Sequence, residues 1–250
     1  MIWFWLTLAV IIVGIATVVD FSTESKSELL KERVLFIFAH PDDESMFFGP
    51  TLEYLSKHRN VQVHLLCLSN GNADGLGNLR QTELVNAASQ FQIPKSNIKI
   101  LSDKRLRDGM YERWDPIVIG KHVYDYMIDK NIRLAITFDK DGISGHPNHK
   151  ACFYGALNAS KMIVDMQLFT LKSVGFLKKY LYWLDCCRMV IAKLLFSKQK
   201  YITIEAQRQS IRTIRNAMIE GHRSQMVWFR YGWIYLSRYM FLNTLEQVLS

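Results

Sequence analysis

The chain has 250 residues, of which 49% are hydrophobic, and a formal net charge of +8. This length allows one large domain or two small ones, and the apolar content excludes a chain too polar to form a core. The four cysteines show neither framework spacing nor a CxxC pair, which argues against a disulfide scaffold and favours a reducing compartment.

The positive charge is concentrated in the last third of the chain. Residues 171–250 contain 13 Lys and Arg but only 4 Asp and Glu, whereas the preceding part is nearly neutral. Such a segment predicts an acidic partner surface, for which anionic lipid, phosphate and nucleic acid are the candidates. The chain carries no nucleic-acid-binding motif, so we expect lipid or phosphate and no nucleic acid. The alternative is a solvated basic face.

The N-terminus predicts a membrane anchor. Residues 2–19 contain no charged side chain, and an 18-residue helix spans about 27 Å, enough for a hydrocarbon core. A secretory signal would need a basic start and a better cleavage site than Ala16-Thr17-Val18. A buried core helix is the other alternative. We therefore expect one transmembrane anchor over 1–20.

The residues after the anchor set the domain organisation. Residues 21–32 are rich in Ser, Glu and Lys and predict a linker, and residues 33–250 predict a single globular domain. Basic residues just after the anchor slightly favour a cytosolic position for this domain under the positive-inside rule.

Strand and helix patterns alternate through the domain. Strands are expected near 33–38, 61–68, 98–101, 133–138, 168–176 and 201–204, and helices near 45–58, 79–91, 116–130, 147–160 and 205–220. Such alternation predicts an α/β fold, a Rossmann-like three-layer sandwich with a mostly parallel sheet. The glycine loop at 71–77 lacks the dinucleotide-binding spacing, so we expect no dinucleotide.

Two later segments are apolar, aromatic and basic, namely 176–197 and 226–249. The first is too charged to span a bilayer, but it suits a helix lying in the membrane interface. Ordinary packing is the alternative, and the aromatic residues of the second segment fit either a core or an interfacial belt.

Two polar clusters follow predicted buried strands. His40 precedes Asp42 and Asp43, while His146 and His149 flank Pro147-Asn148 after the strand near 133–138. If the two strands are neighbours, the clusters face each other. Histidine and aspartate are zinc ligands, and a catalytic site combines three of them with an open position and a nearby base.

The other histidines have no such context. His58, His64, His122 and His222 are each expected to be structural or exposed, and Glu44 is expected to act as a first-turn helix charge.

The two clusters, read as Ala39-His40-Pro41-Asp42-Asp43-Glu44 and Gly145-His146-Pro147-Asn148-His149, resemble the LmbE/PIG-L family of zinc-dependent N-acetylglucosaminide deacetylases. The resemblance covers about 33–245 and includes Arg80 and Glu83. The N-terminal anchor and the tail at 222–230 look like the eukaryotic membrane branch. That branch removes the acetyl group of N-acetylglucosaminyl-phosphatidylinositol, the second step of glycosylphosphatidylinositol (GPI) anchor synthesis, at the cytosolic face of the endoplasmic reticulum.

The resemblance also implies roles for individual residues. His40, Asp43 and His149 become the zinc ligands, and Asp42 becomes the general base. His146 is implied to polarise the amide carbonyl, stabilise the oxyanion or protonate the amine, and Arg80 to contact the sugar or its phosphate. Similar ligands also bind Fe(II), Co(II) or Mn(II).

Two alternatives to this function stay open at this point. One is a deacetylase for another N-acetylglucosamine conjugate. The other is a membrane-tethered carbohydrate-binding protein with a structural metal site, which a closed sphere of four protein ligands would indicate.

Overall fold

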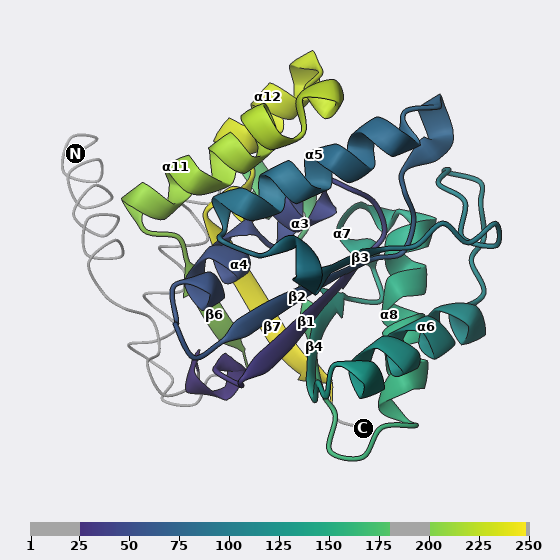
Figure 1. Ribbon diagram of the computed structural model, residues 1–250. Coiled ribbons are helices and arrows are strands. Elements are labelled where there is room, and N and C mark those ends of the chain that lie inside the picture. Colours follow the sequence, from purple (N-terminus) through teal and green to yellow (C-terminus); the bar gives the residue numbers. More distant parts are fainter. Residues whose placement is uncertain (1–25, 181–200, 249–250) are drawn as a thin grey trace.

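The computed structural model describes residues 26–180 and 201–248 (Figure 1). The predicted anchor over 1–20 lies outside the described residues, as does 181–197 of the predicted interfacial segment. Within the described residues, no helix combines the length and the apolar character needed to cross a membrane. A 3₁₀ turn, η1 (Ser27–Leu29), lies within the predicted linker and buries Leu29.

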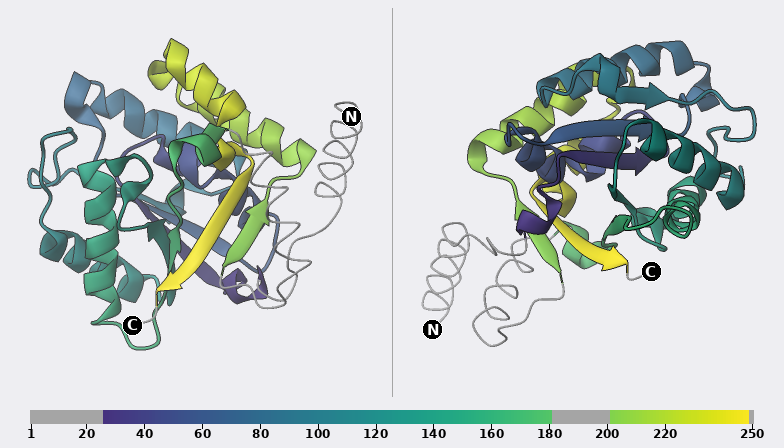
Figure 2. Two further views of the ribbon diagram at one scale, coloured as in Figure 1. Left: turned by 180° about the vertical axis from the view of Figure 1, so that it is seen from behind. Right: turned by 60° about the horizontal axis from the view of Figure 1, so that its bottom comes forward.

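Seven strands form one mixed sheet in the order β3-β2-β1-β4-β5-β7-β6. The first five are mutually parallel, and β7 runs antiparallel to both of its neighbours (Figure 2). The predicted α/β class and mostly parallel sheet are therefore confirmed. The strands are β1 (Arg33–Phe38), β2 (Gln62–Cys67), β3 (Ile98–Ile100), β4 (Leu134–Phe138), β5 (Gln167–Leu171), β6 (Ile202–Glu205) and β7 (Leu242–Val248).

Helices cover both faces of this sheet, giving the three layers that the sequence predicts (Figure 1). One layer contains α4 (Gly49–Ser56), α5 (Gly77–Gln90) and α11 (Arg208–Asn216), and the other contains α6 (Pro116–Asp129) and α8 (Pro147–Ser160). Both faces of the central strands are thus removed from water, which is why β1 and β4 consist of nearly uninterrupted apolar residues.

Shorter helical segments connect these layers. They are η2 (Asn72–Asp74), η3 (Lys95–Asn97), α7 (Gly142–Gly145), α9 (Phe176–Tyr180), the π-helical segment η4 (Ala217–Gly221), η5 (Arg223–Gln225), α12 (Trp228–Leu236) and η6 (Arg238–Met240). The helix expected near 116–130 is confirmed as α6, which begins at Pro116 and is capped by the Asp115 carboxylate, an acceptor of the Ile117 N–H at 2.8 Å.

One helix prediction was wrong, and one strand was not predicted. The single helix expected over 45–58 is divided at Phe48 into α3 (Asp43–Phe47) and α4. Pro50 follows the break and has no N–H to donate to the Met46 carbonyl four residues earlier, which instead accepts from Trp233 Nε1 at 3.2 Å. The aromatic C-terminal segment also contains β7, which inserts between β5 and β6 and pairs with both. Local pattern alone could not reveal that insertion.

The sheet order decides where a ligand site can form. The neighbouring strands β1 and β4 continue in opposite directions along the sheet, β1 to β2 and β4 to β5, so the connections leaving their carboxyl ends diverge. A crevice forms outside the sheet at such a switch point. The loops after β1 and β4 meet at this crevice, because the two strands are neighbours in the sheet. The two polar clusters therefore face each other, as the sequence predicts for neighbouring strands.

Candidate metal centre

Three side chains from the two predicted clusters meet at this crevice. His40, Asp43 and His149 are all buried, and each offers one ligand atom to a group whose members lie within 4.8 Å of one another. His149 Nε2 is 3.2 Å from Asp43 Oδ1, and His40 Nδ1 is 3.6 Å from Asp43 Oδ2. Two ligands at about 2.0–2.2 Å from one ion have similar separations. The donor set and its spacing therefore fit a divalent metal ion.

Surrounding groups fix the orientation of these side chains. The His149 Nδ1 atom lies 3.3 Å from the Gly142 carbonyl oxygen, so its proton can be donated there and leave Nε2 free for a metal. Phe138, the last residue of β4, stacks on the His149 ring with centroids 4.1 Å apart. Asp43 accepts the backbone N–H groups of Ala39 and His40 at 3.0 and 2.9 Å. The strand end and the first helical turn thus position the carboxylate.

Asp108 also lies at the centre, although the sequence motifs do not include it. Its Oδ1 is 3.0 Å from His40 Nε2, and its Oδ2 is 3.2 Å from Arg80 Nη1. Burial disfavours the charged imidazole, but hydrogen bonds to Asp108 and Asp43 outweigh this effect and raise the pKa of His40 to about 9. Metal binding must therefore displace a proton from the metal-free protein. One sequence feature could have indicated Asp108. It lies in the connection after β3, and the connections that follow the parallel strands reach the same edge of the sheet.

Asp42 adopts an unusual backbone conformation beside the ligands. Its φ of 118° lies in a region that non-glycine residues rarely occupy. Its N–H donates to Glu44 Oε2 at 3.0 Å, and its Oδ2 contacts Arg80 Nη2 at 3.3 Å and Arg230 Nη1 at 2.6 Å. These contacts orient the Asp42 carboxylate, which is not part of the group of His40, Asp43 and His149.

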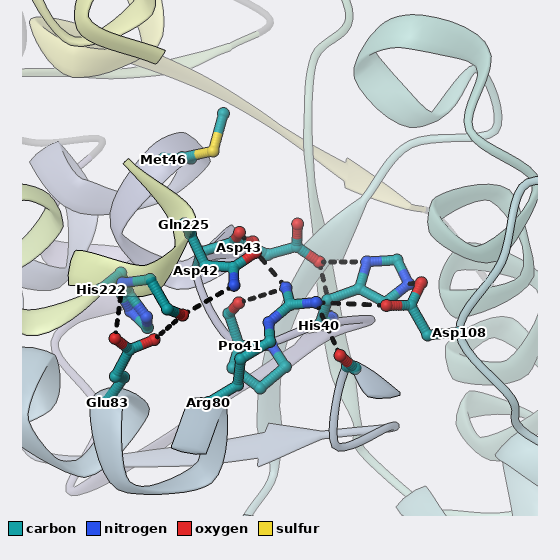
Figure 3. A network of polar contacts seen from close by, with 12 residues as sticks. His40, Pro41, Asp42, Asp43, Met46, Arg80, Glu83, Asp108, His222 and Gln225 are labelled. Atoms are coloured by element: carbon teal, nitrogen blue, oxygen red, sulfur yellow. Dashed lines mark hydrogen bonds and ion pairs between the residues drawn. The ribbon is translucent and has the colours of Figure 1, made fainter. Parts of the chain in front are cut away.

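Arg80 is buried and connects the loops of the site (Figure 3). From α5, its guanidinium donates to the carbonyl oxygens of Gly71 and Pro41, both at 2.8 Å, and contacts Asp42 and Asp108. These contacts support the loop that carries Asp42. That Arg80 also contacts a substrate stays a prediction.

His146 lies next to both histidine ligands and is only partly buried. Its ring centroid is 4.7 Å from that of His149 and 5.1 Å from that of His40. The Asn148 backbone N–H donates to His146 Nδ1 at 3.2 Å. The neutral imidazole therefore carries its proton on Nε2, which makes that atom a hydrogen-bond donor. Burial, together with the neighbouring histidines, lowers the pKa of His146 to about 4.

The structure gives Glu44 and His222 a shared role that the sequence did not indicate. Glu44 does lie in the first turn of α3, but its carboxylate is fully buried and accepts from Ser45, from the Asp42 N–H and from His222 Nε2 at 2.7 Å. His222 is also fully buried. Burial alone would lower the pKa of His222, but the charge and hydrogen bond of Glu44 raise it. The pair supports the loop that carries Asp42.

Replacing His222 should therefore be costly. His222→Leu should lower the free energy of unfolding by about 3–5 kcal/mol, because it leaves the Glu44 carboxylate buried without its partner. His122→Leu is the matched control, since His122 pairs with Asp103 in a partly exposed position and should contribute only about 1 kcal/mol or less. Denaturant titration of both variants measures the difference, and equal losses would contradict a role for the buried pair.

Three residues that contact the site come from the C-terminal region, beyond the two clusters. Arg230 on α12 reaches Asp42, His222 reaches Glu44, and Ser224 donates its N–H and Oγ to Glu83 at 2.7 and 2.6 Å. The only sequence signal for them was the similarity of the tail at 222–230 to the membrane branch. Their convergence depends on how α11 and η4 pack.

Comparisons with known proteins agree with this geometry. Residues 35–160 match the protein family described as PIG-L, GlcNAc-PI de-N-acetylase. A probable N-acetylglucosaminyl-phosphatidylinositol de-N-acetylase of Schizosaccharomyces pombe is 49% identical over 99% of both chains. The N-acetylglucosaminyl-phosphatidylinositol de-N-acetylase of Bos taurus is 37% identical over 86% of this chain and 83% of its own.

Solved structures support the fold. A deacetylase of teicoplanin biosynthesis aligns with a TM-score of 0.59 and 15% identity, covering 87% of this chain and 98% of the other. At that identity the likeness concerns the fold alone. The family match and the extended sequence identity, however, span both ligand clusters, and the chain therefore belongs to the PIG-L family of GlcNAc-PI de-N-acetylases.

Proposed function

We propose that this protein hydrolyses the N-acetyl group of N-acetylglucosaminyl-phosphatidylinositol, producing glucosaminyl-phosphatidylinositol and acetate. The observation that carries the proposal is the buried group of His40, Asp43 and His149 with Asp42 held beside it. The names of the relatives from Schizosaccharomyces pombe and Bos taurus supply the substrate. Hydrolysis of an amide needs both a polarised carbonyl and a base, and this arrangement offers the groups for both.

His40, Asp43 and His149 would hold the metal ion, which we propose to be zinc; Fe(II), Co(II) and Mn(II) are the other candidates that suit such ligands. When bound, the ion would act as a Lewis acid toward the amide carbonyl and make water more acidic. Among the described residues, three side chains rather than four form the ligand group. An open position favours catalysis over the structural-site alternative.

The residues of this chain account for the proton movements. Asp42 accepts a proton from the attacking water as the oxygen–carbon bond forms, and returns it to the nitrogen as the carbon–nitrogen bond breaks. His146 Nε2–H faces the developing oxyanion as a hydrogen-bond donor, which is why we place it there rather than as the acid. The second proton of the water leaves with the acetic acid and is lost to solvent.

We further propose that Arg80 helps to bind the sugar, together with Asp108. Both line the centre, and Asp108 is about one tenth exposed, so its carboxylate can accept hydrogen bonds from sugar hydroxyls. Arg230 is more exposed than Arg80, which makes it the better candidate for the anionic phosphate.

The N-terminal segment gives the proposed setting. We propose that residues 1–20 anchor the chain in the endoplasmic reticulum membrane, that 21–32 link this anchor to the domain over 33–250, and that the domain lies on the cytosolic side. The uncharged stretch at 2–19 supports this arrangement. Protease treatment of sealed microsomes should digest the domain; protection of the domain would place it in the lumen.

The deciding experiment uses the purified full chain and synthetic N-acetylglucosaminyl-phosphatidylinositol. Metal-stripped protein should release little acetate, and zinc should restore the activity. Lipid-free N-acetylglucosaminyl-inositol is the comparison substrate. Equal activity on both would favour a deacetylase for another conjugate, and no activity on either with zinc bound would favour the carbohydrate-binding alternative.

A further inference from the structure

The apolar side chains that the structure leaves in water are unevenly distributed. Of the 18 large hydrophobic side chains that are exposed among the described residues, eight belong to 176–177 and 227–236. Trp228 is 84% exposed and Phe176 is 75% exposed. We define the aromatic face as the six residues Phe176 and Leu177 of α9 with Trp228, Phe229, Tyr235 and Leu236 of α12. Clustered exposure of this kind marks an interaction surface rather than ordinary surface variation.

The helix α12 is two-sided, and its inner side reaches the metal centre. Trp233 and Ile234 are buried, and Trp233 Nε1 donates to the Met46 carbonyl at 3.2 Å. Arg230 Nη1 contacts Asp42 Oδ2 at 2.6 Å. The exposed pairs at 228–229 and 235–236 are two helical turns apart and therefore share the outer side. The helix α12 thus contacts the loop that carries Asp42 on one side and presents the aromatic face on the other.

The two helices form one surface. Tyr180 of α9 packs against Trp233 with ring centroids 6.1 Å apart, and Lys179 Nζ lies 5.6 Å from the same ring. The two segments contribute only basic side chains, because no Asp or Glu occurs in 166–180 or in 221–245, whereas Lys178 and Arg223 are exposed there; Arg230 is paired with Asp42. Exposed Trp, Tyr and Phe among basic residues suit the headgroup region of a bilayer that contains anionic lipid.

We propose that the aromatic face docks on a phospholipid bilayer, so that the metal centre opens toward lipid headgroups. This inference rests on the proposed function, since a substrate with two acyl chains stays in the bilayer and the enzyme must approach it. The face gives the domain a second attachment besides the predicted anchor, and it sets the orientation of the domain, which a single flexible tether does not.

Photocrosslinking tests the docking without relying on activity. The full chain is reconstituted in phosphatidylcholine vesicles that contain phosphatidylinositol and a phospholipid with a photoactivatable headgroup-proximal group. After irradiation, mass spectrometry should find lipid adducts on peptides covering 176–180 and 227–236. Peptides covering 161–166 are the internal control, because Met162 and Val164 are exposed apolar residues before β5, at the opposite edge of the sheet. Absence of adducts on the aromatic face, or equal labelling of the control, would overturn the proposal.

Matched variants supply a second measurement. Trp228→Ser combined with Phe229→Ser should reduce acetate release from bilayer-embedded substrate at least tenfold, and should leave release from lipid-free N-acetylglucosaminyl-inositol phosphate within twofold of the unmodified protein. Val164→Ser should change neither rate. Equal loss on both substrates, or no loss on either, would overturn the docking role. If the unmodified protein is inactive on both substrates, the proposed function is refuted. The lipid adducts found by photocrosslinking would still test whether the aromatic face contacts the bilayer.

Discussion

Asp42→Asn is expected to reduce the rate of acetate release by about 10²–10⁴-fold, the usual contribution of a general base. Asparagine has nearly the same shape and can still accept a hydrogen bond from Arg230 or Arg80, but it cannot take a proton from water. Asn also tolerates positive φ better than most residues, so the backbone at this position, with φ of 118°, should be retained. The loss should therefore appear in kcat, measured by acetate release at saturating substrate.

Metal content separates this role from a structural one. Asp42 is outside the ligand group of His40, Asp43 and His149, so Asp42→Asn should bind zinc in the same ratio as the unmodified protein. Asp74→Asn, in an exposed position of the loop after β2, is the control for a carboxylate-to-amide change and should retain activity. Full activity in Asp42→Asn would refute the proposed mechanism, and loss of zinc would assign Asp42 to the ligands.

Asp43→Asn is expected to remove both activity and tight metal binding. It replaces the one anionic ligand of the proposed site with a neutral amide, so zinc affinity should fall by more than the roughly 10–100-fold typical of losing an outer partner of a ligand. The Asp43 carboxylate also accepts the N–H groups of Ala39 and His40. Both N–H groups donate to the same oxygen, Oδ2, which an amide can still supply, but the amide is neutral and loses the charge that faces His40. The metal-free protein should therefore lose about 1–3 kcal/mol of unfolding free energy.

Asp108→Asn is the matched control for this second prediction. Asp108 contacts His40 but is not part of the ligand group, so its variant should weaken zinc binding only within the range for an outer partner. Competition with a metal chelator measures both affinities. If Asp108→Asn lost more zinc affinity than Asp43→Asn, the proposed assignment would be wrong, and Asp108 rather than Asp43 would be the metal ligand.

Much of the fold could be predicted because its signals are local. The apolar runs of β1, β2 and β4, the start signal at Asp115-Pro116 and the alternation of strands and helices identify the α/β class. The break at Phe48 and the insertion of β7 could not be predicted in the same way. Pro50 is a local signal for the first, but the break also depends on Trp233, which is distant in the chain and takes the Met46 carbonyl. The second depends on pairing between strands far apart in the chain.

The sequence by itself determined the chemical identity of the centre. His40, Asp42, Asp43, His146 and His149 lie in two short clusters, and strand–loop–helix geometry brings each cluster to the same sheet edge. Their ligand types restrict the possible metals and chemistry, and these properties belong to individual residues and their immediate neighbours. Such properties can be read from the sequence without knowing how the chain folds.

Only the tertiary structure decided what supports the loop that carries Asp42. Glu44 changes from a helix charge to the buried partner of His222. Asp108 joins the site from a segment without a motif, and Arg230 joins it from the tail at 222–230, whose resemblance assigned no role to this residue. The exposure of the aromatic face was likewise undecided by composition, since the same aromatic residues could have formed core. Burial and long-range pairing depend on the packing of whole elements, because a side chain's partners arise only when distant segments meet.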